Sequence, residues 1–565
     1  MIEELTPLLL GVSLMLDIML ASALTLLASA GVLWLYRRRV LRAMAASAGG
    51  EAITADAVVT GAAPPDSRAD RADALYRRAL RGPWRAAARD AAAGAVFALL
   101  MTGALGLAFP AMASPQRLTL CAWGYAWPVL LAWLLTGPGG ARAAVFALAA
   151  YFAPLLVATL FALAADAPPL RSGDDVAALR EAITPFDAAK AWLLANAVPT
   201  ALLLLFLNRR VRAVGPLLLG LITIATTGVV LALLMVFTKQ GSEWFVRAMV
   251  AIANAAAAAG LSAPWLLRAV LYVSLLGMLL AALLGFGALG WWLLRRIRRA
   301  YLCKAINDRT LALDALWLFF ASIYAMLFAT AGLGWALAPL LAFAAYKLAW
   351  TALLPRALAQ DARGLTFLRV FSLGRRSDRL LDALARRWRH VGCLQLITGP
   401  DVAHSTVQPH QLLDFLAGRL ATHFIGDAVS LDVRMRALDA APDRDGRYRI
   451  NNFFCHADTW QAVLARLVRE GDVVLMDLRS FTRDHAGCVH ELRHLVNHVP
   501  LQRCVLLVDK GTDQALVRHT LNEAWAGMRP QSPNRAASPD SVPLHPYAGG
   551  QTALRRLVRR LCEAG

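Results

Sequence analysis

The chain has 565 residues, of which 58% are hydrophobic and 17% charged, and its mean hydropathy is +0.51. This balance excludes an ordinary soluble protein and a chain embedded throughout, and favours a membrane domain joined to a soluble one. The formal net charge is +20, but many arginines directly flank hydrophobic segments, as in 37–39 and 295–299. Arginines placed there orient spans and contact anionic headgroups, so the expected partner is the lipid bilayer and not nucleic acid.

Apolar segments of roughly 17 to 25 residues, long enough to cross a bilayer, occur at about nine places within residues 1–355. The loops on one side of these segments carry dense arginine clusters, whereas a long loop on the other side carries several acidic residues. This alternation predicts a multi-pass inner-membrane protein with the N-terminus outside and the C-terminal domain in the cytoplasm. The expected spans are 18–36, 91–113, 118–136, 143–165, 191–207, 213–238, 269–294, 313–331 and 334–352.

Residues 40–90, between the first two expected spans, are rich in Ala, Asp and Arg and predict a partly flexible cytoplasmic linker. Ionisable residues close to expected spans are Asp17, Arg268 and Asp314. Such residues either mark an ion or substrate path or lie at the membrane interface. The first interpretation would make the protein a transporter or channel with a regulatory soluble domain, which is one alternative for its function.

Residues 365–565 alternate between short apolar runs and helical patterns, which predicts a cytosolic α/β domain with a mainly parallel, flavodoxin-like sheet. The expected strands are 365–371, 393–398, 473–477 and 504–508, with 542–544 as an edge strand. A hairpin between 431–435 and 447–451 is also expected, because Asp445-Gly446 supplies the positive φ of a tight turn.

Polar residues follow the expected strand at 473–477 directly. Asp477, Ser480 and Glu491 fall where ligands gather in open α/β sheets, at the carboxyl ends of the strands. These three side chains are therefore the first candidates for a functional site.

Three stretches of the soluble domain carry a resemblance to a known family. They are the first strand ending in Phe371-Ser372, the run VLARLVREGDVVLMDLRSF followed by AGCVHEL, and the strand CVLLVD. Together they resemble a Toll/interleukin-receptor (TIR) domain over roughly 365–565. The segment Cys488–Leu492 matches the family's W-C-x-x-E-L motif with Gly487 in place of Trp, and 421–456 is a larger insertion than the family normally carries.

Enzymatic members of the TIR family cleave the nicotinamide–ribose bond of NAD with the Glu of this motif. The resemblance therefore implies that Glu491 is a catalytic carboxylate and NAD a substrate, with no cofactor. Ser372, Gly374 and Arg375 would then supply a hydroxyl, backbone amides and a cation to the pyrophosphate. Asp477 and Ser480 would orient ribose hydroxyls, and the membrane domain would act as an anchor or sensor in signalling or defence.

Other interpretations stay open at this point. Glu491 could favour the first turn of its helix, where the dipole stabilises an anion, or pair with an arginine. In that case the domain would be a non-catalytic interaction module that forms homo-oligomers or recruits partners. Cys455, His456, Cys488 and His490 have no usual zinc spacing, so no metal site is expected.

Overall fold

The structure is a computed structural model, and its chain divides into two compact units. We call them the helical unit (Met1–Val32, Arg89–Leu135 and Gly139–Leu353) and the α/β unit (Leu33–Ala88, Thr136–Pro138 and Leu354–Gly565). The residues that the structure describes are 2–47, 68–110, 113, 115–136, 141–165, 211, 214–237, 239–259, 264–329, 331–355, 361–369, 375–398, 408–482 and 485–564.

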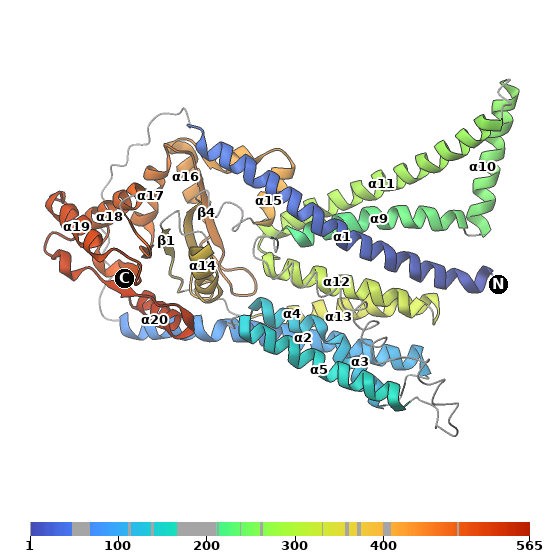
Figure 1. Ribbon diagram of the computed structural model, residues 1–565, viewed down its shortest axis with the longest axis horizontal. Coiled ribbons are helices and arrows are strands. Elements are labelled where there is room, and N and C mark those ends of the chain that lie inside the picture. The colour runs from blue at the N-terminus through green and yellow to red at the C-terminus, as the bar shows by residue number, and fades with distance from the viewer. Residues whose placement is uncertain are drawn as a thin grey trace. The chain divides into compact units, whose positions relative to one another are not determined.

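Four helix segments in the described part of the chain are long and apolar enough to cross a membrane: Met19–Ala45, Asp70–Ala108, Gly215–Leu233 and Arg268–Leu302. They overlap four of the nine expected spans (18–36, 91–113, 213–238 and 269–294), and 191–207 lies outside the described residues. The segment expected at 118–136 is divided at Ala126 into two short helices. Up to residue 355 the α-helices labelled in Figure 1 are α1 (Ile2–Ala45), α2 (Arg68–Ala108), α3 (Pro115–Tyr125), α4 (Trp127–Thr136), α5 (Ala141–Ala165), α9 (Gly215–Phe237), α10 (Lys239–Ala258), α11 (Pro264–Leu302), α12 (Asp308–Ala329) and α13 (Ala338–Ala352).

Buried charges in the helical unit are paired with one another. Asp90 of α2 is 2% exposed, forms an ion pair with Arg309 of α12 and accepts a hydrogen bond of 2.9 Å from the indole nitrogen of Trp350 in α13. Asp314 lies 2.7 Å from the amine of Lys347. Asp314 and Lys347, whose side chains are 24% and 31% exposed, thus form a partly buried ion pair between apolar helices.

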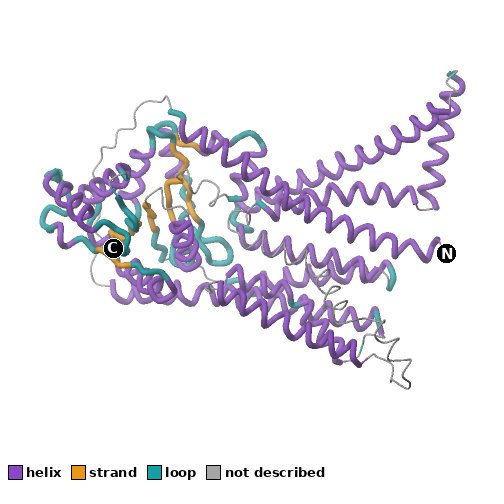
Figure 2. Tube along the Cα trace, viewed as in Figure 1, coloured by secondary structure: helices purple, strands orange, loops and turns teal. Residues whose placement is uncertain are grey.

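The α/β unit contains one sheet of seven strands, in the order β3-β4-β2-β1-β5-β6-β7, with every neighbouring pair parallel. This confirms the expected parallel α/β sheet, drawn in orange in Figure 2. Its inner strands read as short apolar runs because helices cover both faces. The strands are β1 (Leu365–Arg369), β2 (Leu394–Thr398), β3 (Phe424–Ile425), β4 (Ile450–Cys455), β5 (Val473–Asp477), β6 (Cys504–Val508) and β7 (Leu544–Pro546).

Successive side chains of β1 point to opposite faces of the sheet. Phe367 belongs to a core with α14 (Arg375–Trp388) and α20 (Gly550–Glu563), while Leu368 belongs to a second core with α17 (Trp460–Glu470), α18 (Ala486–His498) and α19 (Gln514–Ala526). The sheet is therefore the middle of three layers. The remaining helical segments are α15 (Pro409–Leu416), α16 (Ala428–Arg436) and the short η2 (Leu333–Leu337), η3 (Leu420–His423), η4 (Leu501–Arg503) and η5 (Pro539–Ser541).

Five strands, β2-β1-β5-β6-β7, follow the order of flavodoxin-type sheets, and β4 and β3 extend the sheet beyond β2. The prediction of a hairpin between 431–435 and 447–451 is wrong. Residues 431–435 lie inside α16, whose N-cap Asp427 accepts a hydrogen bond of 2.7 Å from the backbone of Ser430. Gly446 does have a positive φ of 81° in a turn, but this turn leads into the parallel strand β4.

The segment expected to be a linker at 40–90 is largely helical where it is described, since α1 extends to Ala45 and α2 begins at Arg68; residues 48–67 lie outside the described part. Leu75 and Ala79 of α2, both 0% exposed, belong to the core formed with α14 and α20. The α/β unit therefore includes residues of α2 that are separated in sequence from its strands by most of the helical unit.

The end of α1 also packs within the α/β unit. The Tyr36 ring meets Phe415 of α15 edge to face, with 5.3 Å between centroids, and the Nδ1 of His456 lies 2.8 Å from the carbonyl oxygen of Ala43. The helix α15 and the end of the insertion at 421–456 thus provide the surface that α1 contacts.

Candidate functional site

The carboxyl ends of β1 and β5 lie at the point where the order in which the chain adds strands to the sheet reverses. From β1 the chain passes to β2 and the inserted strands on one side, then returns to β5 and continues to β6 and β7 on the other. Ligands of open α/β sheets bind outside the strands at such a switch point. Arg369 ends β1 and stands in register with Asp477, which ends β5.

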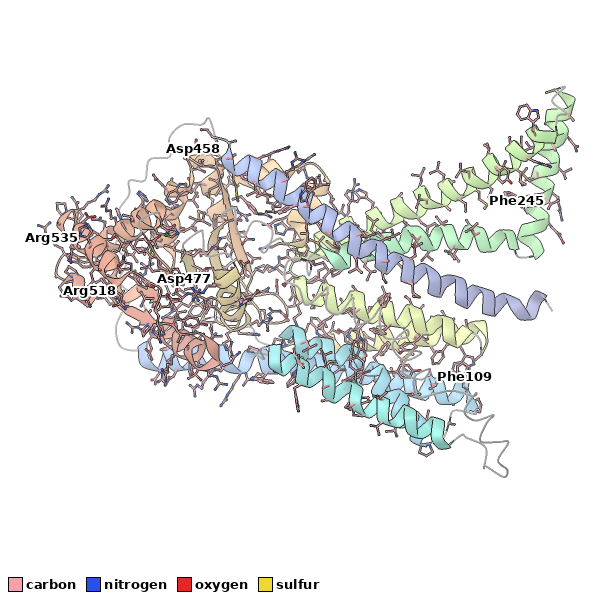
Figure 3. All side chains as sticks on the ribbon, in the orientation of Figure 1. Phe109, Phe245, Asp458, Asp477, Arg518 and Arg535 are labelled. Atoms are coloured by element: carbon pink, nitrogen blue, oxygen red, sulfur yellow. The ribbon has the colours of Figure 1, made fainter. Side chains whose placement is uncertain are left out.

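Asp477 is 0% exposed, and both of its carboxylate oxygens are bound inside the protein. Arg479 donates from Nε to Oδ1 at 2.8 Å and from Nη2 to Oδ2 at 2.7 Å. The hydroxyl of Ser377, at the start of α14, donates to Oδ2 at 3.1 Å. Asp477, labelled in Figure 3, therefore holds Arg479 and α14 in place. Its carboxylate can accept a hydrogen bond from a ribose hydroxyl only if that bond replaces one from Arg479 or Ser377.

Arg376, in the first turn of α14, connects this helix to the segments that follow β5 and β6. Its guanidinium donates to the Ser480 hydroxyl at 3.1 Å, after β5, and to the carboxylate of Asp509 at 2.9 Å, after β6. Ser480 has a positive φ of 58°, which is uncommon for a residue with a side chain. The Arg376 side chain is 58% exposed, so it presents a cation to solvent at this edge of the sheet.

Glu491 is 1% exposed, and its Oε2 has no hydrogen-bond partner among the described residues. It lies in the second turn of α18, beyond the first turn in which the helix dipole stabilises an anion. Burial raises the pKa of Glu491 to about 8, although the positive charge of Arg369 opposes the shift. At pH 7 the carboxyl group is thus mainly neutral, as the cost of burying an isolated charge requires.

Glu491 and Asp477 approach this edge from opposite faces of the sheet. Glu491 is carried by α18, whose Cys488 and Leu492 belong to the core with α17 and α19, whereas Ser377 binds Asp477 from α14. Burial raises the pKa of Cys488, and the charges of Glu491 and Asp477 raise it further. Cys488 is accordingly a buried thiol and not a nucleophile.

Ser372 and Gly374 lie outside the described residues, and Arg375 is the first residue of α14 with a side chain that is not described. Sequence reasoning missed Arg369, Arg376 and Asp509. Each lies at or within two residues of a strand end or a helix start, and this position is the sequence feature by which they could have been identified as site residues. In the described part of the chain no three His, Cys, Asp or Glu side chains are grouped to hold a metal ion.

Comparisons with protein-family models, with curated proteins and with solved structures find no match to this chain.

Proposed function

We propose that the chain is a multi-pass inner-membrane protein whose cytosolic α/β unit binds a nucleotide at the carboxyl ends of β1 and β5 and cleaves the nicotinamide–ribosyl bond of NAD. The observation that carries this proposal is the buried Glu491, whose pKa is raised and whose Oε2 has no hydrogen-bond partner in the described part of the chain. Carboxyl groups with strongly shifted pKa values gather at functional sites. The resemblance of Cys488–Leu492 to the TIR motif supports NAD as the substrate.

The exposed guanidinium of Arg376 supports recognition of the phosphate groups. Arginine binds phosphate with two parallel hydrogen bonds, and a pyrophosphate would compete with Asp509 for it. Ser372, Gly374 and Arg375 are proposed as neighbouring phosphate contacts because they come just before Arg376 in the chain. Asp477 acts in this proposal by positioning Arg479, and Ser480 by binding Arg376.

In the proposed reaction the bond between C1′ of the ribose and the nicotinamide nitrogen breaks, and its electron pair leaves with nicotinamide. The oxygen of a water molecule then bonds to C1′, which gives ADP-ribose. The Glu491 carboxylate stabilises the positive charge that develops on the ribosyl group and accepts the proton of the water. Because only the ionised carboxylate can do this, kcat/KM should increase with pH until about 8.

Glu491 is 1% exposed, so side chains at this edge must move before a nucleotide can contact its carboxyl group. Low activity of the resting protein follows from this burial. In this proposal the membrane domain is an anchor or sensor in signalling or defence, and it supplies the signal that starts NAD cleavage. Self-association of the α/β units is one such signal.

The test is nicotinamide release from NAD by the full-length protein in lipid nanodiscs, with and without antibody-induced clustering. Glu491→Gln should lower the rate by roughly two orders of magnitude or more, with an unfolding midpoint at pH 6 that is no lower than that of the wild type. Glu470→Gln on α17 is the matched control, because Glu470 is an exposed acid that forms a surface ion pair with Arg466. Unchanged activity in Glu491→Gln would end the catalytic assignment. Clustering without any NAD cleavage would instead favour the non-catalytic interaction module.

A further inference from the structure

The turn after β6 places a lysine at the carboxyl edge of the sheet. Lys510 is exposed, and it is the single lysine in the sequence of the α/β unit, which otherwise carries its permanent positive charge on arginines. Among the described residues Lys510 forms no ion pair. A surface lysine by itself indicates no site, but both chain neighbours of Lys510 lie against residues of the candidate site.

Hydrogen bonds fix the turn that carries Lys510. The Gly511 amide donates to Oδ1 of Asp509 at 3.0 Å, and the Asp509 amide donates to the Thr512 hydroxyl at 2.9 Å. Thr512 is 7% exposed, and its hydroxyl donates to the carbonyl oxygen of Leu478 at 3.1 Å. The turn is thus attached to the segment that follows β5, and the backbone of Lys510 is held in one place.

Lys510 lies between two residues that contact Arg376 or its partner Ser480. On one side, Oδ2 of Asp509 accepts the hydrogen bond of 2.9 Å from Arg376. On the other side, a Cβ atom placed on Gly511 would lie 3.6 Å from the hydroxyl oxygen of Ser480, which itself accepts from Arg376 at 3.1 Å. The flexible four-carbon side chain of Lys510 therefore begins beside the Arg376 guanidinium.

The charges of these three side chains do not balance, since Arg376 and Lys510 are two cations and Asp509 is one carboxylate. Below them, Asp477 and Arg479 neutralise each other. The next acid along the chain, Asp513, caps α19 by accepting a hydrogen bond of 2.9 Å from the Leu516 amide. A net positive charge thus remains at an edge where the Arg376 side chain is 58% exposed, and such a place attracts an anion.

Two neighbouring cations of different shape suit two linked phosphates better than one. The planar guanidinium of Arg376 can bind one phosphate with two parallel hydrogen bonds. The ammonium of Lys510 is a compact point charge that can approach the next phosphate. A monophosphate needs only the first of these contacts, so the second cation distinguishes a diphosphate from a monophosphate.

We propose that Arg376 and Lys510, which we call the cation pair, bind the two phosphates of a diphosphate group, and that Asp509 occupies Arg376 while no nucleotide is bound. The ligand class is a nucleoside diphosphate or a dinucleotide with a pyrophosphate. This inference rests on the proposed nucleotide binding at this edge and specifies which part of the nucleotide is recognised. Only Oδ2 of Asp509 binds Arg376, whereas Oδ1 binds the turn, so Asp509 can release Arg376 without unfolding the turn.

The experiment measures binding of ADP and AMP to the full-length protein in phosphatidylcholine nanodiscs by isothermal titration calorimetry. ADP contains no nicotinamide, so its binding is measured without cleavage. The variants are Lys510→Gln and Asp509→Asn; asparagine keeps an Oδ1 acceptor for the turn and removes the negative charge. Arg535→Gln is the matched control for loss of one positive charge, because Arg535 is exposed and follows the far end of α19; it is labelled in Figure 3.

The wild type and the control should bind ADP more tightly than AMP by roughly ten-fold, and Lys510→Gln should lose most of this preference by weakening ADP binding. Asp509→Asn should strengthen ADP binding by roughly three-fold or more, because the phosphate no longer displaces a carboxylate. No ADP binding by the wild type, equal affinities of ADP and AMP, or an unchanged preference in Lys510→Gln would each overturn the proposal, as would unchanged or weaker ADP binding in Asp509→Asn.

Nicotinamide release from NAD, measured on the same proteins, separates this inference from the proposed cleavage. ADP binding with the expected changes but without NAD cleavage would support the cation pair and contradict the catalytic role of Glu491. NAD cleavage with the same ADP affinity in all four proteins would overturn the cation pair and leave the proposed cleavage standing.

Discussion

The guanidinium of Arg479 binds both carboxylate oxygens of Asp477, two residues before it, at 2.8 and 2.7 Å. Both side chains are nearly inaccessible, at 7% and 0% exposure. The pair thus closes the end of β5 and leaves neither charge uncompensated, at the place where the nucleotide is proposed to bind.

Asp477→Asn should destabilise the α/β unit by about 3–5 kcal/mol, because it leaves the buried Arg479 without its counter-charge. Chemical denaturation of the purified full-length protein, followed by a probe in the α/β unit, measures the change. Asp540→Asn in η5 is the control, since Asp540 is exposed. A loss of less than about 1 kcal/mol would show that Arg479 finds other partners or water.

Glu491 should make the stability of the α/β unit depend on pH. Its pKa is raised from an ordinary value of 4.5 to about 8 by burial, so the folded state binds more protons than the unfolded state between these values. The stabilising effect of the neutral group is complete below about 4.5 and is lost as the pH rises through about 8.

The matching measurement is the unfolding free energy of wild type and Glu491→Gln between pH 5 and pH 9. The difference between the two proteins should grow with pH by an amount on the order of a few kcal/mol in favour of the glutamine variant. Comparing the variants removes the contribution of Asp443, whose pKa burial raises to about 7. A difference that stays constant with pH would mean that Glu491 is ionised in the folded protein.

Leu75→Ala should destabilise the α/β unit by about 2–5 kcal/mol, the usual cost of a cavity at a fully buried leucine. Leu107→Ala, in the same helix but 72% exposed, is the control and should change that unit little. Unfolding monitored in the α/β unit distinguishes the two. An equal, small effect of both changes would show that α2 is not part of this core.

Tyr36 and Phe415 should be energetically coupled although 379 positions separate them in the sequence. A double-mutant cycle with Tyr36→Leu and Phe415→Leu should give a coupling of about 0.5–1.5 kcal/mol, typical of an edge-to-face aromatic pair. A coupling close to zero would contradict the contact between the end of α1 and α15.

Local patterns predicted most strands of the α/β unit well. The apolar runs at 473–477 and 504–508 coincide with β5 and β6. A parallel strand covered on both faces must be apolar throughout, so its sequence is distinctive. In the insertion the same reasoning failed: the turn at Gly446 was correct, but an N-cap at Asp427 and packing of Leu431 made the preceding segment helical.

For the candidate site, the sequence pointed to the carboxyl ends of the strands but not to the contacts made there. Ser377 meets Asp477 and Arg376 meets Asp509 across separations of 100 and 133 residues, and no local pattern specifies which of many arginines makes such a contact. The burial of Glu491 is likewise a property of the packed layers around α18.

The sequence by itself determined that this protein combines apolar membrane-type helices with a parallel α/β fold, because hydrophobic period and length follow directly from the order of residues. Only the tertiary structure decided that α1 and α2 complete the α/β unit, that Asp477 is bound by Arg479 and Ser377, and that Glu491 is buried with a raised pKa. Except for the local pair of Asp477 and Arg479, these features depend on groups distant in sequence that become neighbours only when the chain folds, and on the exclusion of water that follows.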